Sequence, residues 1–192
     1  MIKAIIFDWG GVLAEADTES AANYLAEKYQ CNALEIKKII QQYEPLCSES
    51  NDYQLFLEKI NQKFKIPFEE IKKAMLLLPE MRNKEIIKRL QDKYILCILS
   101  NQMKFKTDFI RETNDLSCFD FLFFSSEIGC QKPSSKAFLF VVDRINISAQ
   151  ECLFIDDNPI NVAAAKEIGM QGLLCINPNQ LEIILRKYKK DF

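Results

Sequence analysis

Residues 5–13 read IIFDWGGVL, and this stretch carries the strongest single signal for the fold of the chain. The largely apolar run of residues 2–7 leads directly into Asp8, which is followed by Trp9 and two glycines. A short, continuous apolar run predicts a strand that is covered on both faces of a sheet. We therefore expect a buried strand over residues 2–7, with Asp8 at its carboxyl end.

Four more runs of this kind follow further along the chain, at residues 94–99, 119–124, 152–155 and 172–176. Helical patterns accompany them, at residues 84–91, 104–113, 135–144, 159–168 and 180–189. The Asn158-Pro159 pair is a plausible start for the fourth of these helices, and Gly169 a plausible end. Alternating strands and helices predict an α/β fold with a doubly wound parallel sheet.

Residues 14–79 depart from this alternation. They contain four amphipathic helical patterns with no strand between them, at residues 19–29, 33–43, 53–64 and 68–77. The spacing of Ile36, Ile39, Ile40 and Tyr43 is that of one buried helix face. We therefore expect a core domain made of residues 1–13 and 80–192, interrupted by a small helical cap at residues 14–79.

The composition excludes several kinds of enzyme. The chain of 192 residues has no histidine, which rules out serine–histidine and cysteine–histidine hydrolases and histidine-ligated zinc. A net charge of −2 gives no reason to expect a nucleic acid or an anionic membrane as a partner. It leaves the oligomeric state open.

The cysteines and the first residues indicate a compartment. None of the seven cysteines forms a Cys-x-x-Cys pair, and Cys97, Cys152 and Cys175 lie in or beside apolar runs. Buried, reduced thiols are therefore expected. The opening MIKAIIFDWGG has neither the length nor the flanks of a signal peptide, and no later run is long enough to span a bilayer. We expect a cytoplasmic protein.

Polar clusters follow four of the five predicted strands: Asp8, Ser100-Asn101, Ser125-Ser126 and Asp156-Asp157. The carboxyl ends of parallel strands share one edge of the sheet, where ligands bind. Residues almost 150 positions apart should therefore become neighbours. Several oxygen donors without a histidine favour a hard cation such as Mg²⁺.

Four motifs in order resemble those of the haloacid dehalogenase superfamily: residues 5–13 (IIFDWGGVL), Leu99-Ser100-Asn101, Gly129-Cys130-Gln131-Lys132-Pro133, and Phe154-Ile155-Asp156-Asp157-Asn158-Pro159. Each motif alone is weak, whereas the ordered set is specific. The motifs frame the whole sheet domain, and the insertion after the first one matches the position of that family's helical cap.

The resemblance implies roles for individual residues. Asp8 would be the nucleophile that attacks phosphorus, and Lys132 would assist it. The residues implied for Mg²⁺ are Asp8, the carbonyl of Gly10, Asp156 and Asp157. Those implied for the phosphate are Ser100, Asn101 and Lys132, while Asn161 is expected to support the site or cap a helix. The substrate would be a small phosphorylated metabolite, with sugar phosphates among the candidates.

Gly10 departs from the pattern of the family's phosphatases. They usually carry a second aspartate at this position, which protonates the leaving group and then activates water. General acid–base catalysis of this kind contributes about 10²–10⁴-fold. The chain could be a phosphatase for a substrate with a good leaving group, such as an anomeric sugar phosphate or an acyl phosphate. Glu15 or Asp17 could alternatively replace the missing acid.

Two other interpretations stay open at this point. The first is a 2-haloacid dehalogenase, which needs neither Mg²⁺ nor a leaving-group acid. The pair of carboxylates at residues 156 and 157 argues against it, because it would put negative charge beside an anionic nucleophile. The second is a catalytically impaired protein that binds a phosphorylated metabolite. The aromatic residues of the cap, among them Tyr24, Tyr43, Tyr53 and Phe56, have the spacing of core residues rather than of substrate contacts.

Overall fold

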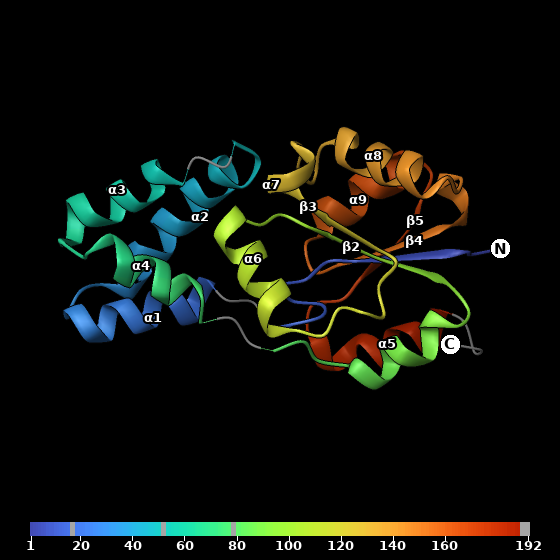
Figure 1. The fold of residues 1–192 in the computed structure, drawn as a ribbon, viewed down its shortest axis with the longest axis horizontal. Helices are drawn as coiled ribbons and strands as arrows, with labels where there is room; N and C mark the ends of the chain where they lie inside the picture. The colour runs from blue at the N-terminus through green and yellow to red at the C-terminus, as the bar shows by residue number, and fades with distance from the viewer. Residues whose placement is uncertain (16–17, 51–52, 78–79, 189–192) are drawn as a thin grey trace.

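The computed structural model describes residues 1–15, 18–50, 53–77 and 80–188 (Figure 1). Its five strands are β1 (Ala4–Phe7), β2 (Ile95–Ser100), β3 (Phe121–Phe124), β4 (Cys152–Asp156) and β5 (Gln171–Leu174). They form one sheet in the order β3-β2-β1-β4-β5, and each pair of neighbours is parallel. The doubly wound parallel sheet predicted from the sequence is therefore confirmed.

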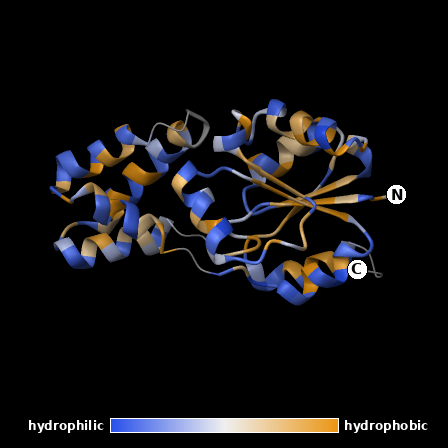
Figure 2. Cartoon of the chain, viewed as in Figure 1, coloured by the Kyte–Doolittle hydropathy of each residue, from blue (hydrophilic) through white to orange (hydrophobic). Residues whose placement is uncertain are grey.

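The two faces of the sheet bury alternate residues of each strand. Ile5 and Phe7 of β1 belong to a hydrophobic cluster with α5 (Lys84–Gln91), α6 (Lys104–Thr113) and α10 (Leu181–Tyr188). Ala4 and Ile6 belong to a second cluster with α8 (Ser135–Ile145) and α9 (Pro159–Glu167). Figure 2 shows the apolar strands running between these helices. Burial on both faces explains why the central strands are apolar throughout.

Some predicted strand limits differ from the observed ones. β1 begins at Ala4 instead of residue 2, and β3 begins at Phe121 instead of residue 119. β5 covers Gln171–Leu174 instead of residues 172–176, and it is only partly buried because it lies at an edge of the sheet. Among the helices around the sheet, α5 and α6 begin and end at the predicted residues.

Between β1 and α5 lie the helices α1 (Thr18–Tyr29), α2 (Ala33–Ser50), α3 (Gln54–Phe64) and α4 (Phe68–Met75). They pack around a hydrophobic cluster of their own, which includes Phe56, and the partly buried tyrosines pack against it. Met103, at the start of α6, joins this cluster. Helix α2 passes Tyr43, the predicted end, and continues through Pro45, because Cys47 is buried in the same cluster.

The remaining elements are short: α7 (Ser125–Ile128) and two 3-10 helices, Ala149–Glu151 and Pro178–Gln180. All seven cysteines are free, and Cys97, Cys152 and Cys175 are buried as predicted. Within the described part of the chain, no helix has the length and apolar character needed to cross a bilayer.

Candidate active site

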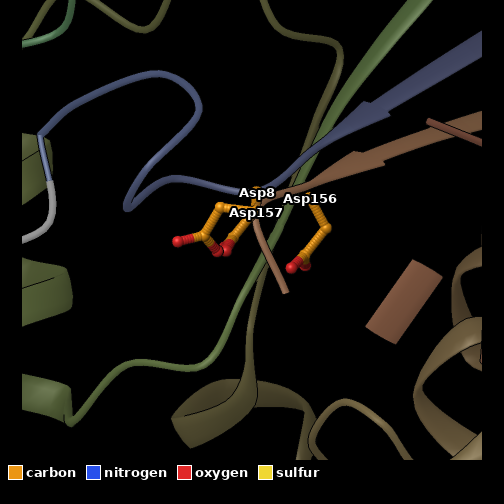
Figure 3. Close-up of side chains that lie close together, drawn as sticks. All are labelled: Asp8, Asp156 and Asp157. Atoms are coloured by element: carbon orange, nitrogen blue, oxygen red, sulfur yellow. The ribbon is translucent and has the colours of Figure 1, made fainter. Parts of the chain in front are cut away.

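The carboxyl edge of the sheet brings together three aspartates. Asp8 follows β1, Asp156 is the last residue of β4, and Asp157 comes next. Hydrogen-bonded register between β1 and β4 places their ends side by side. One carboxylate oxygen from each residue lies within 4.8 Å of the other two, and Figure 3 shows the side chains lying close together. The prediction that residues of the first and fourth motifs become neighbours is confirmed.

Lys132 lies between two of these carboxylates. Its Nζ is 2.8 Å from Asp8 Oδ1 and 2.6 Å from Asp156 Oδ2. The lysine side chain is only 1% exposed. The backbone N–H of Trp9 also donates to Asp8 Oδ1 at 2.7 Å, so this oxygen is held from two sides. Asp8 Oδ2 receives no hydrogen bond from the residues that the structure describes.

Burial and charge shift the pKa values of this cluster. Burial raises the pKa of Asp8 to about 6, against the opposing effect of Lys132. Burial, followed by the charge of Asp156, also raises the pKa of Asp157. Burial alone would lower the pKa of Lys132, but Asp8 and Asp156 together raise it, so the lysine stays charged. Perturbed groups that share one site are typical of active sites.

Asn101 fixes the backbone of Lys132. Its side-chain Nδ2 donates to the Lys132 carbonyl at 2.8 Å, and its Oδ1 accepts from the Lys132 N–H at 3.0 Å. The sequence suggested that Asn101 binds phosphate. In the structure, both ends of the side-chain amide are engaged with the backbone of Lys132.

Further hydrogen bonds hold the carboxylate of Asp156, and Asp157 lies against Gly11. Asn161 Nδ2 lies 3.1 Å from both oxygens of Asp156, and the Asn158 N–H donates to Oδ1 at 2.8 Å. Asn161 thus supports the site, as expected. Asn158 also caps α9 through its side chain. Gly11, with φ of 77°, gives Asp157 room: a Cβ atom there would lie 2.3 Å from Asp157 Oδ2.

A cavity of about 290 Å³ opens above these residues. Its lining includes six of the predicted site residues: Asp8, Gly10, Ser100, Asn101, Lys132 and Asp157. Asp156 is fully buried beneath it. Glu15 is absent from the described lining, and Asp17 lies outside the described residues. Ser125 and Ser126 do not line it either; Ser125 Oγ instead accepts from the Gln102 N–H at 3.0 Å.

Sequence reasoning missed three lining residues: Glu44, Gln102 and Lys106. Lys106 carried a detectable signal, because it occupies the face of α6 that also buries Thr107 and Ile110. A lysine at such a position is unusual. Gln102 follows Ser100 closely at the end of β2, whereas nothing in the sequence separates Glu44 from an ordinary residue of a surface helix.

The cluster suits a divalent cation. Three carboxylates and one ammonium group leave it with a formal charge of −2, in a place that is mostly shielded from water. Carboxylate oxygens are the ligands that Mg²⁺ prefers, and a divalent ion would balance the charge. The donor set therefore fits the metal that the sequence suggested.

A parallel sheet whose carboxyl edge gathers acidic residues around a buried lysine defines an α/β enzyme with a carboxylate-centred site. The sequence matches the model of haloacid dehalogenase-like hydrolases over residues 2–169. The chain therefore belongs to the haloacid dehalogenase-like hydrolase family, and it is a hydrolase.

Individual relatives share almost the full length of the chain. A D-ribitol-5-phosphate phosphatase of Bacteroides thetaiotaomicron is 27% identical, with 89% of this chain and 90% of the relative aligned. A sesquiterpene phosphatase of Aspergillus oryzae is 28% identical, with 89% and 88% aligned.

The fold also matches solved structures. A haloacid dehalogenase family enzyme of Bacteroides thetaiotaomicron, solved with magnesium and inorganic phosphate, superposes with a TM-score of 0.75. The match covers 91% of this chain and 94% of that one at 22% identity, which shows a common fold.

Proposed function

We propose that this chain is a Mg²⁺-dependent phosphomonoester hydrolase, acting on a small phosphorylated metabolite through an aspartyl-phosphate on Asp8. The observation that carries the proposal is the buried lysine between Asp8 and Asp156, at the sheet edge where Asp157 completes an acidic site. Two relatives with phosphatase names, aligned over most of their length, support the reaction class.

In the proposed reaction, Asp8 Oδ2 attacks phosphorus while Oδ1 stays bound to Lys132 and to the Trp9 N–H. The bond between phosphorus and the ester oxygen breaks, and the alcohol leaves with a proton taken from solvent water. A water molecule then attacks the phosphorus of the aspartyl-phosphate and breaks its bond to the Asp8 oxygen. This step releases inorganic phosphate, returns a proton to the solvent and restores the carboxylate of Asp8. The Lys132 ammonium stabilises the phosphoryl charge in both steps, because a fixed charge in a buried site needs no reorganisation.

The residues proposed to hold Mg²⁺ are Asp8, the Gly10 carbonyl, Asp156 and Asp157. When bound, the ion supplies positive charge that lets an anionic nucleophile approach an anionic ester. Ser100 and Lys132 are proposed to bind the phosphoryl oxygens. Asn101 is proposed to position Lys132, through its two hydrogen bonds to that residue's backbone.

We further propose that residues 14–79 are a cap on a core made of residues 1–13 and 80–192. Helices α1–α4 supply almost all of a hydrophobic cluster that is distinct from the two clusters on the faces of the sheet, and this supports the division. The cap also supplies Glu44 to the lining of the cavity, so it contributes to the surroundings of the substrate. Covering a site in this way excludes water during the reaction.

A dehalogenase is the less favoured reaction. Displacement of halide from a carbon needs no cation, and the substrate is itself a carboxylate. Asp156 and Asp157 would then add repulsion beside Asp8 without serving the reaction. Metal-independent release of chloride from chloroacetate would reverse this preference.

The proposal is tested with a panel of phosphorylated metabolites, assayed with Mg²⁺ and with a chelator. We expect phosphate release that depends on Mg²⁺ and that is absent in Asp8→Asn, a variant of the same shape without a nucleophilic carboxylate. Phosphate release at the wild-type rate by this variant would contradict the proposed role of Asp8. If calorimetry showed binding of Mg²⁺ and phosphate while no ester turned over, the chain would be a binding protein.

A further inference from the structure

The outer face of helix α8 exposes two apolar side chains next to each other. Leu139 is 52% exposed and Phe140 is 42% exposed, while the opposite face of the helix packs on the sheet through Phe138 and Val141. Helix α8 lies on the other side of the sheet from α5 and α10 (Figure 1). Single exposed apolar residues are common, whereas contiguous ones mark contact with another molecule. This face of α8 is therefore a candidate contact surface.

The ring of Phe140 is held in place by two rings of the sheet. Its centroid lies 6.0 Å from that of Phe123 in a T-shaped arrangement, and Phe123 stacks on Phe121 at 5.9 Å. Phe121 and Phe123 belong to β3, an edge strand of the sheet. A side chain that is already fixed loses little conformational freedom when a partner covers it. The row of three rings therefore gives this surface a preformed apolar anchor.

Opposite charges flank the two apolar residues on the same face of the helix. Lys136 lies one turn before Leu139 and Phe140, and Asp143 lies one turn after them. Residues at this spacing line one side of a helix. Both charged residues are exposed, and neither forms an ion pair with any residue that the structure describes. The order along this face is thus a positive residue, two apolar residues and a negative residue.

This order is complementary to itself when a second copy of α8 lies antiparallel to the first. With a twofold axis between Leu139 and Phe140, each Leu139 faces Phe140 of the other copy. The same axis places each Lys136 opposite Asp143 of the other copy, so that two ion pairs flank a shared apolar centre. Dimers with twofold symmetry are the commonest oligomers, and their interfaces must match themselves in this way.

We propose that the outer face of α8 is a dimer interface, which binds the same face of a second copy of this chain in antiparallel orientation. Arg144 then lies opposite Ser135, so the pairing brings no like charges together along the helix. A parallel pairing would instead place Lys136 opposite its own copy. A partner of another sequence would not explain why the two free charges mirror each other about the apolar pair. Among the described residues, those that line the active-site cavity lie outside α8, so the inference does not rest on the proposed phosphatase function.

The oligomeric state of the full chain tests this inference. Sedimentation velocity is measured at chain concentrations from about 1 µM to about 1 mM, because a helix of 11 residues makes a small interface and hence a weak dimer. Leu139→Arg should raise the Kd of the dimer at least about 10-fold, because twofold symmetry puts two unpaired charges at the apolar centre. Ile183→Arg is the matched control and should leave the Kd unchanged, since Ile183 is 55% exposed on α10, which covers the other face of the sheet.

Two charge substitutions test the antiparallel orientation. Lys136→Glu puts a carboxylate opposite Asp143, and Asp143→Lys puts an ammonium opposite Lys136, so each variant alone should bind itself at least about 10-fold more weakly. An equimolar mixture of the two variants should recover the wild-type Kd within about 3-fold, because opposite charges face each other again in the mixed dimer. Lys38→Glu makes the same charge change at an exposed position of α2 and should leave the Kd unchanged.

Recovery in the mixture is specific to the proposed pairing, since two variants that are both defective repair each other only if the substituted positions face one another. A wild-type chain that stays monomeric over the whole concentration range would overturn the inference. So would a dimer that Leu139→Arg leaves intact, or a mixture that dimerises no better than its separate components. If Leu139→Arg did not fold, as judged by circular dichroism, the two charge variants would decide, because both of their side chains are exposed.

Discussion

Gly10 offers a direct test of how the enzyme works without the usual second aspartate. The residue lines the cavity beside Asp8, and its backbone is outside the left-handed region. A Cβ atom built at this position meets no atom within 4 Å. Gly10→Asp should therefore fold without strain and present a carboxyl group to the cavity.

The size of the effect follows from acid catalysis and from the neighbouring charges. A well-placed general acid contributes about 10²–10⁴-fold. The new carboxyl group would lie near three carboxylates, and their charges should raise its pKa and keep part of it protonated. Since nothing in the site is built to orient it, we expect an effect no larger than the lower limit of this range, about 10- to 100-fold in kcat/KM for alkyl phosphates. For p-nitrophenyl phosphate, whose leaving group needs no proton, we expect less than about 3-fold.

The assay measures kcat/KM for a series of phosphate esters with leaving groups of increasing basicity. The wild type should lose activity steeply along this series, and Gly10→Asp should lose it less steeply. Gly10→Asn is the control, because it has the same shape without an acidic proton. If Gly10→Asp were folded and bound Mg²⁺, yet kept the wild-type dependence on the leaving group, our account of the missing acid would be refuted.

Three other substitutions test the site around Asp8. Gly11→Ala should weaken Mg²⁺ binding about 10-fold in calorimetry, because the new methyl group displaces Asp157, whereas Gly10→Ala should have little effect. Asn101→Leu should lower kcat about 10- to 100-fold with Mg²⁺ affinity preserved, because Lys132 loses two backbone hydrogen bonds; unchanged kcat would remove the positioning role. Lys132→Met should lower the free energy of unfolding by about 3–5 kcal/mol in chelator, since two buried carboxylates lose their cation. Added Mg²⁺ should restore part of that loss in thermal melts, and equal melting with and without the metal would contradict it.

The sheet could be predicted from the sequence because its signal is local. Each strand is a short apolar run, and continuous burial follows directly from having helices on both faces. The end of helix α2 and the exposure of strand β5 were not predicted, because both depend on contacts outside the segment itself. Helix α2 passes Pro45 because Cys47 is buried among residues of other helices, which no pattern within α2 reveals. The partial exposure of β5 depends on its place at the edge, which is a property of the whole sheet.

The acidic centre could be predicted for a similar reason, since strand order brings the ends of β1 and β4 together. The parts that could not be predicted depend on side-chain direction and on contacts between distant segments. Asn101 follows Ser100 in sequence, but its amide turns to the backbone of Lys132. Glu44 enters the cavity only because α2 packs against the sheet domain.

The glycine at residue 10 bears on the choice of substrate. It withholds a proton donor from the cavity beside Asp8, and this favours an ester whose alcohol leaves easily. If the chain is the phosphatase that we propose, we expect it to hydrolyse an aldose 1-phosphate faster than a primary alkyl phosphate, because an anomeric oxygen leaves more readily than a simple alkoxide. Equal kcat/KM for the two kinds of ester would contradict this expectation.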